Sequence, residues 1–183
     1  MKKIPVANIP AGACLVGNMS NLDFLHVDCA LLNDRLTAFE AYCIMTKDIS
    51  LPLRGAFFLR DKISRLFAVQ EIRGFSRNRT KSTPSAGGRL DFFTVERSED
   101  HQLVLSSRDR HLAVMVSVDI APRADCATAI GHTRSMHVTT SVETYNKFGR
   151  LYMVPVAVAH RHIVRNMLRK VEVVAGASKE GSR

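Results

Sequence analysis

The residue whose type and position most readily suggest chemistry is His160, near the C-terminus. At 100° per residue, a helix over about 149–173 would place it in the middle of an apolar face. The other members of that face are Tyr152, Val156, Ile163, Val164, Met167 and Val171. An imidazole held there could hydrogen-bond a ligand, or act as a general acid or base near neutral pH. The alternative is a structural histidine bonded within the core, because buried polar groups normally find protein partners.

A second polar group, Asp109-Arg110-His111, lies at a turn that leads into a predicted strand. Arg110 or His111 could bind an anionic head group at the mouth of a cavity, because a guanidinium offers a planar fork to carboxylates. The structural alternative, which we favour, is an ion pair of Arg110 with Asp109 or with Asp61.

The segment between the last predicted strand and the C-terminal helix supplies further candidates. Gly149 is expected to provide a backbone angle that other residues resist, and Asn146 to cap the helix. Arg150 could close the entrance of a pocket. Tyr152, on the apolar face of the helix, is a further candidate for ligand contact.

The last predicted strand contains one carboxylate whose role depends on its orientation. The alternation of Val and Thr along 138–142 favours Val142 pointing inward and Glu143 pointing outward. An inward Glu143 would be a buried carboxylate and thus a functional candidate, whereas an outward one is ordinary surface.

Motifs of established catalytic chemistry are missing from the sequence. It has no Gly-x-Ser-x-Gly, no His-Glu-x-x-His, no Ser-His-Asp order and no Gly-x-Gly-x-x-Gly after a strand. None of the four cysteines forms a Cys-x-x-Cys pair or lies at metal-ligand spacing from a histidine. The sequence therefore predicts reduced cysteines, no metal site and no cofactor, in a cytoplasmic protein.

The composition is that of one ordinary globular domain with a basic surface. The 183 residues are 46% hydrophobic and 23% charged, and no run approaches the ~20 apolar residues of a membrane-spanning helix. The formal net charge of +9 is concentrated in 54–89, with nine basic and two acidic residues, and in 146–183, with eight and two. These segments could attract anionic lipid or nucleic acid, or be a solvated surface, which is the commoner explanation. Nucleic acid is not favoured, because no helix-turn-helix, zinc finger or RNP-type aromatic pair is present.

Periodicity predicts the elements that would position the candidate residues. Residues 24–31 alternate with period two, which indicates a strand. A short helix is expected next, capped by Asn33 or Asp34 and ending near Thr46, and a second helix from near Pro52 to about Phe67. Residues 74–88 are expected to form a mobile basic loop, and 175–183 a frayed tail.

The middle of the chain is dominated by strand patterns. Residues 90–97 and 102–106 flank a turn and predict a hairpin, and 112–120 and 136–145 predict two further strands. With the long helix at 149–173, this order predicts an α+β fold in which a curved antiparallel sheet wraps around the C-terminal helix, the helix-grip arrangement. Such a sheet and helix tend to leave a cavity between them that suits an apolar ligand.

Three short motifs occur in one order along the chain. They are Leu59-Arg60-Asp61, then Asp109-Arg110-His111, then the run TYNKFGRLY from Thr144 to Tyr152, which is followed by Pro155 and His160. These motifs resemble a bacterial family of proteins of unknown function, family 2867, whose Asn-x-x-Gly-Arg-x-Tyr run the third one is similar to. The resemblance covers about residues 8–172. It implies a single START-like helix-grip domain over 1–183, with two short helices after the first strand, and it implies no activity.

We therefore expect a protein that binds a small apolar or amphipathic molecule between the sheet and the C-terminal helix. The residues expected to contact that molecule are Arg110, His111, His160, Tyr152 and Arg150. One alternative is an enzyme of cyclase or isomerase type, with His160 as the general acid or base. Another is a basic protein that binds nucleic acid or anionic lipid through its surface.

Overall fold

The computed structural model describes residues 9–32, 35–47, 82–122 and 134–177. Its elements are, in chain order, the 3-10 helix η2 (Met19–Asn21), β1 (Phe24–Leu32), α1 (Ala38–Thr46), β2 (Arg89–Leu90), β3 (Phe93–Glu99), β4 (Gln102–Arg108), β5 (Leu112–Pro122), β6 (Arg134–Thr144) and α3 (Lys147–Ala177). The predicted second helix, from Pro52 to Phe67, lies outside the described residues.

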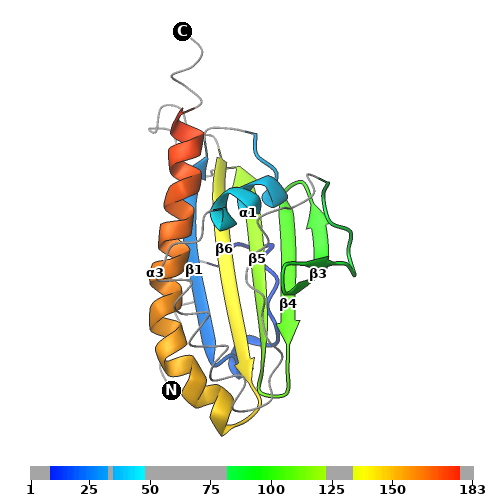
Figure 1. Cartoon of the computed structure of the whole chain (residues 1–183), viewed down its shortest axis with the longest axis vertical. Helices are drawn as coiled ribbons and strands as arrows, with labels where there is room; N and C mark the ends of the chain where they lie inside the picture. Colours follow the sequence, from blue (N-terminus) through cyan, green and yellow to red (C-terminus); the bar gives the residue numbers. More distant parts are fainter. Residues whose placement is uncertain (1–8, 33–34, 48–81, 123–133, 178–183) are drawn as a thin grey trace.

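The strands form one antiparallel sheet in the order β1-β6-β5-β4-β3-β2. Helix α3 packs along β1 and β6, and α1 packs against α3 and against β3, β4 and β5. Both helices lie on the same face of the sheet (Figure 1). This is an α+β architecture consistent with the helix-grip arrangement, as the sequence predicted.

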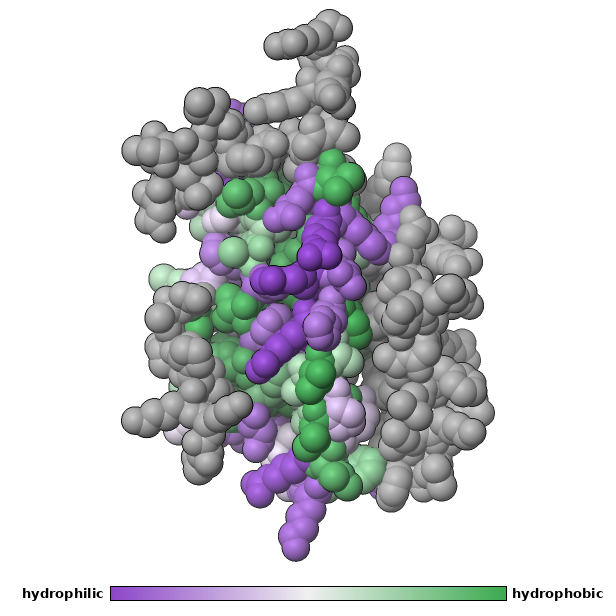
Figure 2. Space-filling view, turned by 90° about the vertical axis from the view of Figure 1, so that its left-hand side faces the viewer, coloured by the Kyte–Doolittle hydropathy of each residue, from purple (hydrophilic) through white to green (hydrophobic). Residues whose placement is uncertain are grey.

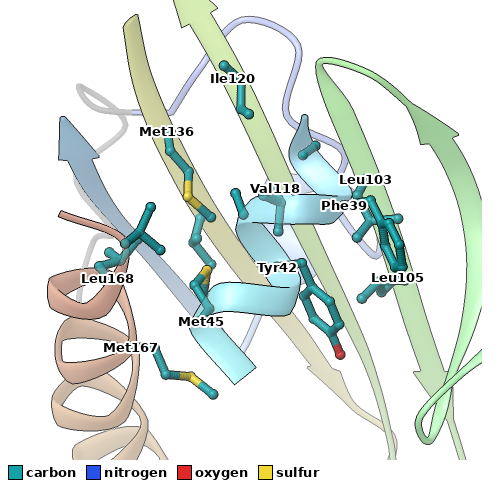
Figure 3. Packing of buried hydrophobic residues seen from close by; sticks show 14 of the residues in the cluster. Phe39, Tyr42, Met45, Leu103, Leu105, Val118, Ile120, Met136, Met167 and Leu168 are labelled. Atoms are coloured by element: carbon teal, nitrogen blue, oxygen red, sulfur yellow. The ribbon is translucent and has the colours of Figure 1, made fainter. Parts of the chain in front are cut away.

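The main hydrophobic core lies between the two helices and this face of the sheet. Alternate residues of each strand point towards it, because successive side chains of a strand leave on opposite faces. Figure 3 shows its members from five elements: Phe39, Tyr42 and Met45 of α1, Leu103 and Leu105 of β4, Val118 and Ile120 of β5, Met136 of β6, and Met167 and Leu168 of α3. The helical periodicity therefore predicted the inner face of α3 correctly. In β1, by contrast, the core side chains are Phe24, Ala30 and Leu32, not those of the more apolar alternate set at 25, 27, 29 and 31.

Helix α1 begins later than predicted. Its N-cap is Thr37, not Asn33 or Asp34, which lie outside the described residues. The Glu40 backbone N–H donates to Thr37 Oγ1 at 3.2 Å, and the Thr37 backbone N–H donates to Glu40 Oε2 at 2.8 Å. This reciprocal capping box satisfies two backbone donors at once, which a single Asn or Asp cap would not do.

Helix α3 starts where Asn146 caps it, as predicted. The Gly149 backbone N–H donates to Asn146 Oδ1 at 3.0 Å. The helix continues through Pro155 without interruption. Proline removes the hydrogen bond to the Leu151 carbonyl, but both residues are exposed, so water can hydrogen-bond that carbonyl.

The opposite face of the sheet is also covered, which the sequence did not predict. Backbone N–H groups of Cys14 and Val16 donate to Ser117 Oγ and Ser141 Oγ, at 3.3 and 2.9 Å. Ser141 and Ser117 are consequently fully buried. Val142 points towards α3 and is buried, as expected, and Glu143 lies on the covered face rather than on an open surface.

Gly149 is required for space rather than for a special backbone angle, so that part of the prediction was wrong. Among the described glycines only Gly87 has a positive φ. A Cβ on Gly149 would lie 2.5 Å from the carbonyl oxygen of His111, which belongs to the backbone and cannot rotate away.

Gly149→Ala is therefore expected to lower the free energy of unfolding by about 1–3 kcal/mol, the usual cost of overpacking. Urea denaturation checks this value. Gly12→Ala is the matched control, because its Cβ would meet only the Gln102 side chain, at an ordinary 3.9 Å. Equal losses in the two variants would contradict the close-approach explanation.

Candidate functional site

Two histidine rings and one phenylalanine ring meet between β1 and α3. The ring centroids of His26 and His160 are 5.5 Å apart, with an interplanar angle of 87°. The Phe24 ring lies 5.4 Å from the His160 ring at 75°. His160 thus occupies the apolar face of the C-terminal helix, as predicted, and His26 is the polar side chain that faces it from the sheet.

The Nδ1 atoms of both histidines are buried and have no hydrogen-bond partner among the described residues. Nδ1 of His160 therefore does not fit the structural alternative, in which the ring is hydrogen-bonded within the core. An unsatisfied buried polar atom costs about 1–3 kcal/mol. Two such atoms on facing rings are a feature that stability alone does not explain.

Both imidazoles are held in the neutral form. Burial, then the neighbouring His26, then Arg161 lower the pKa of His160 to about 4. Burial also lowers the pKa of His26, with Asp28 opposing the shift and Arg161 and Arg165 adding to it. At pH 7 each ring therefore offers one hydrogen-bond donor and one acceptor.

An ion pair one turn along α3 holds the two elements together. The Arg165 guanidinium contacts Asp28 twice, Nε to Oδ2 and Nη2 to Oδ1, each at 3.3 Å. Asp28 is on the same face of β1 as His26, since the two are two positions apart in the strand. This contact fixes which helix residue lies opposite His26.

The histidine pair lies at one level of the sheet, that is, in a row of residues that runs across the strands. This level separates the hydrophobic side chains into two clusters. In the sheet register His26 pairs with Thr140, and Thr140 pairs with Val116. On one side of this level is the main core. On the other is a smaller cluster of Phe24, Val142 and Met153, against which Leu112, Val114, Tyr152, Val156 and Ala157 pack.

Apolar side chains next to this level are incompletely covered. Val114 and Val116 lie on the helix side of β5, a central strand of the sheet, yet both are only partly buried. Tyr152 and Val156 of α3 are also partly buried. The level thus combines polar imidazoles with accessible apolar surface.

Two of the other predicted site residues, Arg110 and His111, lie beside the start of α3, away from His160. Arg110 Nε donates to His111 Nε2 at 3.1 Å, and His111 Nδ1 lies 3.2 Å from Asn146 Oδ1. His160 lies eleven positions after Gly149 in the helix, a rise of about 16 Å. Arg110 and His111 are therefore not brought together with His160.

Arg150 and Tyr152 occupy different environments near the same end. Arg150 is exposed, and its Nε lies 3.9 Å from Asp23 Oδ1. Tyr152 packs against the smaller cluster and is the one of the two on the side of His160. Asp61, which was suggested together with Asp109 as an ion-pair partner of Arg110, lies outside the described residues.

Sequence reasoning overlooked His26. The alternation placed it with Phe24 and Asp28, on the face opposite the more apolar set at 25, 27, 29 and 31, and Phe24 was the one apolar residue of these three. A histidine flanked in this way by core-facing positions is the signal that was available. Its pairing with His160, 134 residues later, depends on the tertiary fold.

The described residues contain neither a candidate metal-binding group nor a candidate membrane-spanning helix. Among them, no three His, Cys, Asp or Glu side chains are grouped so as to hold a metal ion. None of the described helices is both long and apolar enough to span a membrane.

One family model matches most of the chain. The model described as "Protein of unknown function (DUF2867)" matches residues 19–167, a span that includes β1, both histidines and most of α3. No curated protein matches the chain, and no solved structure does. A match over this much of the sequence shows that the chain belongs to the DUF2867 family.

Proposed function

We propose that this protein binds a small apolar or amphipathic molecule between the sheet and α3, with His26 and His160 as its polar anchors. The observation that carries the proposal is the pair of buried Nδ1 atoms without partners on facing rings. A ligand with a hydroxyl, carbonyl or amide group could satisfy both atoms, and its apolar part could contact Val114, Val116 and Val156.

The histidines suit binding better than proton transfer. An effective general base has a pKa near the working pH, and burial lowers the pKa of His160 to about 4. A neutral imidazole of this kind is a weak base and carries no extra proton to donate at pH 7. The same neutral ring costs less to desolvate than a charged one, which favours a role in ligand recognition.

Native mass spectrometry of the protein purified from its host tests the proposal. The wild-type protein is expected to carry a stoichiometric small molecule, and His160→Phe and His26→Phe are expected to lose it. His162→Phe is the matched control, because His162 is exposed on the same helix, and it should keep the molecule.

Stability measurements separate ligand loss from misfolding. Phenylalanine has nearly the shape of histidine and no unsatisfied nitrogen, so His160→Phe should be as stable as the unliganded wild type, or more stable by up to about 2 kcal/mol. A variant that keeps the bound molecule, or a wild-type protein without any, would contradict the proposal.

A further inference from the structure

The outward face of α3 carries an exposed apolar row and a basic row on one line. Leu151, Val154 and Val158 are exposed at 72%, 66% and 64%, values that are high for large apolar side chains. Arg161, Arg165 and Arg169 follow them along the helix. At 100° per residue all six lie within about 80° of one another.

Figure 2 shows this face directly. A column of apolar residues runs down its lower half, hydrophilic residues lie above this column and at its lower end, and a further apolar group lies near the top. Val173, near the C-terminal end of the helix, is a further exposed apolar side chain, at 70%. The helix as a whole has six basic residues and a single acidic one, Glu172.

We propose that this face docks on an anionic lipid surface. The apolar row would enter the boundary between head groups and acyl chains, and the arginines would contact anionic head groups. Binding in this way needs no rearrangement of α3, because both rows are exposed and the opposite side of the helix packs on β1 and α1.

Other occupants fit the surface less well. Nucleic acid would use the arginines but not Leu151, Val154 and Val158, because its phosphate backbone offers charge rather than an apolar contact. A second copy paired antiparallel through this face would place the valines of one helix against the arginines of the other. A lipid surface with negative charge satisfies both rows at once.

Co-sedimentation of the full chain with vesicles tests the proposal. The protein is expected to bind vesicles of phosphatidylcholine with phosphatidylglycerol at least tenfold more tightly than vesicles of phosphatidylcholine alone, and less tightly as salt rises. The double variant Val154→Asp with Val158→Asp should lose at least about tenfold in the partition coefficient. All substituted positions are exposed, so the variants should melt at the wild-type temperature.

The basic row has its own charge-matched control. Arg161→Glu with Arg169→Glu should weaken binding by about tenfold or more, and it leaves the Arg165–Asp28 pair intact. Arg89→Glu with Arg108→Glu makes the same change in net charge at exposed positions away from α3, and it should bind far more like the wild type. Equal losses in the two double variants would overturn the proposal, because they would indicate attraction by net charge only.

The chain has no tryptophan, so a single one can report insertion. Fluorescence emission of Val158→Trp should shift to shorter wavelength on adding the anionic vesicles, and emission of Arg108→Trp should not. Binding to duplex DNA that depends on Arg161 and Arg169, together with no partition into vesicles, would instead assign the face to nucleic acid and overturn the proposal.

Discussion

Lowering the pH from 7 to 4 is expected to remove about 3 kcal/mol of the free energy of unfolding through His160 alone. Its pKa is about 4 in the folded protein and about 6.5 in an unfolded chain. Between these values the unfolded state binds the proton and the folded state does not, so unfolding becomes more favourable as the pH falls. The loss begins near pH 6.5 and is complete below pH 4.

The groups around His160 act in a consistent direction. Arg161, on the same helix, and His26, on β1, both disfavour its protonation. His26 also has a lowered pKa, so it adds to the loss of stability. Asp28 is the neighbouring group that favours a charge on His26, but it is already paired with Arg165.

Urea denaturation at a series of pH values measures the effect. The informative quantity is the difference in the free energy of unfolding between wild type and His160→Phe, because the carboxylates titrate in both proteins and cancel. This difference should change by about 3 kcal/mol in favour of the variant from pH 7 to pH 4. The exposed His162→Gln should follow the wild-type profile. Parallel curves for wild type and His160→Phe would show that the ring is not desolvated.

The order and type of the helices and strands could be predicted from the sequence, because the signals for them are local. The apolar face of α3 repeats with the helical period, and the segments from β3 to β6 are runs rich in β-branched and apolar residues, separated by polar turns. Each pattern arises because one face of the element is buried, so it can be recognised without knowing which other element packs on that face. They also placed His160 correctly on the inner face of its helix.

The candidate site itself could be predicted only by half. His160 was visible on its helix, but its neighbour His26 is brought to it by the packing of α3 on β1. Arg110 and His111 are in a recognisable motif, yet the turn holds them against Asn146 at the start of the helix. Proximity of this kind depends on tertiary structure, which spacing along the chain does not report.

The second face of the sheet shows where a polar pattern misled. Thr139 and Ser141 alternate with apolar residues and so suggested a solvent-facing side, but both are fully buried. Hydroxyl side chains are small and can accept from a crossing backbone, as Ser141 does from Val16. The run of small hydroxyl side chains at 139–141 on a central strand is the feature that would have indicated coverage.

A buried carboxylate organises this covered face. Asp119 is 7% exposed, and its two oxygens accept from different side chains. Gln102 Nε2 donates to Oδ1 at 2.6 Å, and Ser117 Oγ donates to Oδ2 at 2.8 Å. Gln102 in turn donates to the Gly12 carbonyl at 2.7 Å and accepts from Arg97 Nη1 at 2.7 Å. The network thus links β3, β4 and β5 to the N-terminal segment.

Asp119→Ala is therefore expected to lower the free energy of unfolding by about 3 kcal/mol or more. It leaves two buried donors without their charged acceptor, and each such hydrogen bond is worth about 1.5–3 kcal/mol. Asp119→Asn is the matched control, because its Oδ1 can still accept from Gln102, and it should cost about half as much.

Urea denaturation at pH 7 gives both values, and hydrogen exchange at the backbone amides of Cys14 and Val16 locates the effect. Cys14 donates to Ser117, which Asp119 orients, so its amide should exchange faster in Asp119→Ala. Val16 donates to Ser141 of the neighbouring strand β6, two positions beyond Thr139, the residue that pairs with Ser117. Its amide should therefore change less. If Asp119→Ala unfolds within 1 kcal/mol of the wild type with both amides still protected, the N-terminal segment must be held by its backbone bonds to the serines alone, and the carboxylate is dispensable.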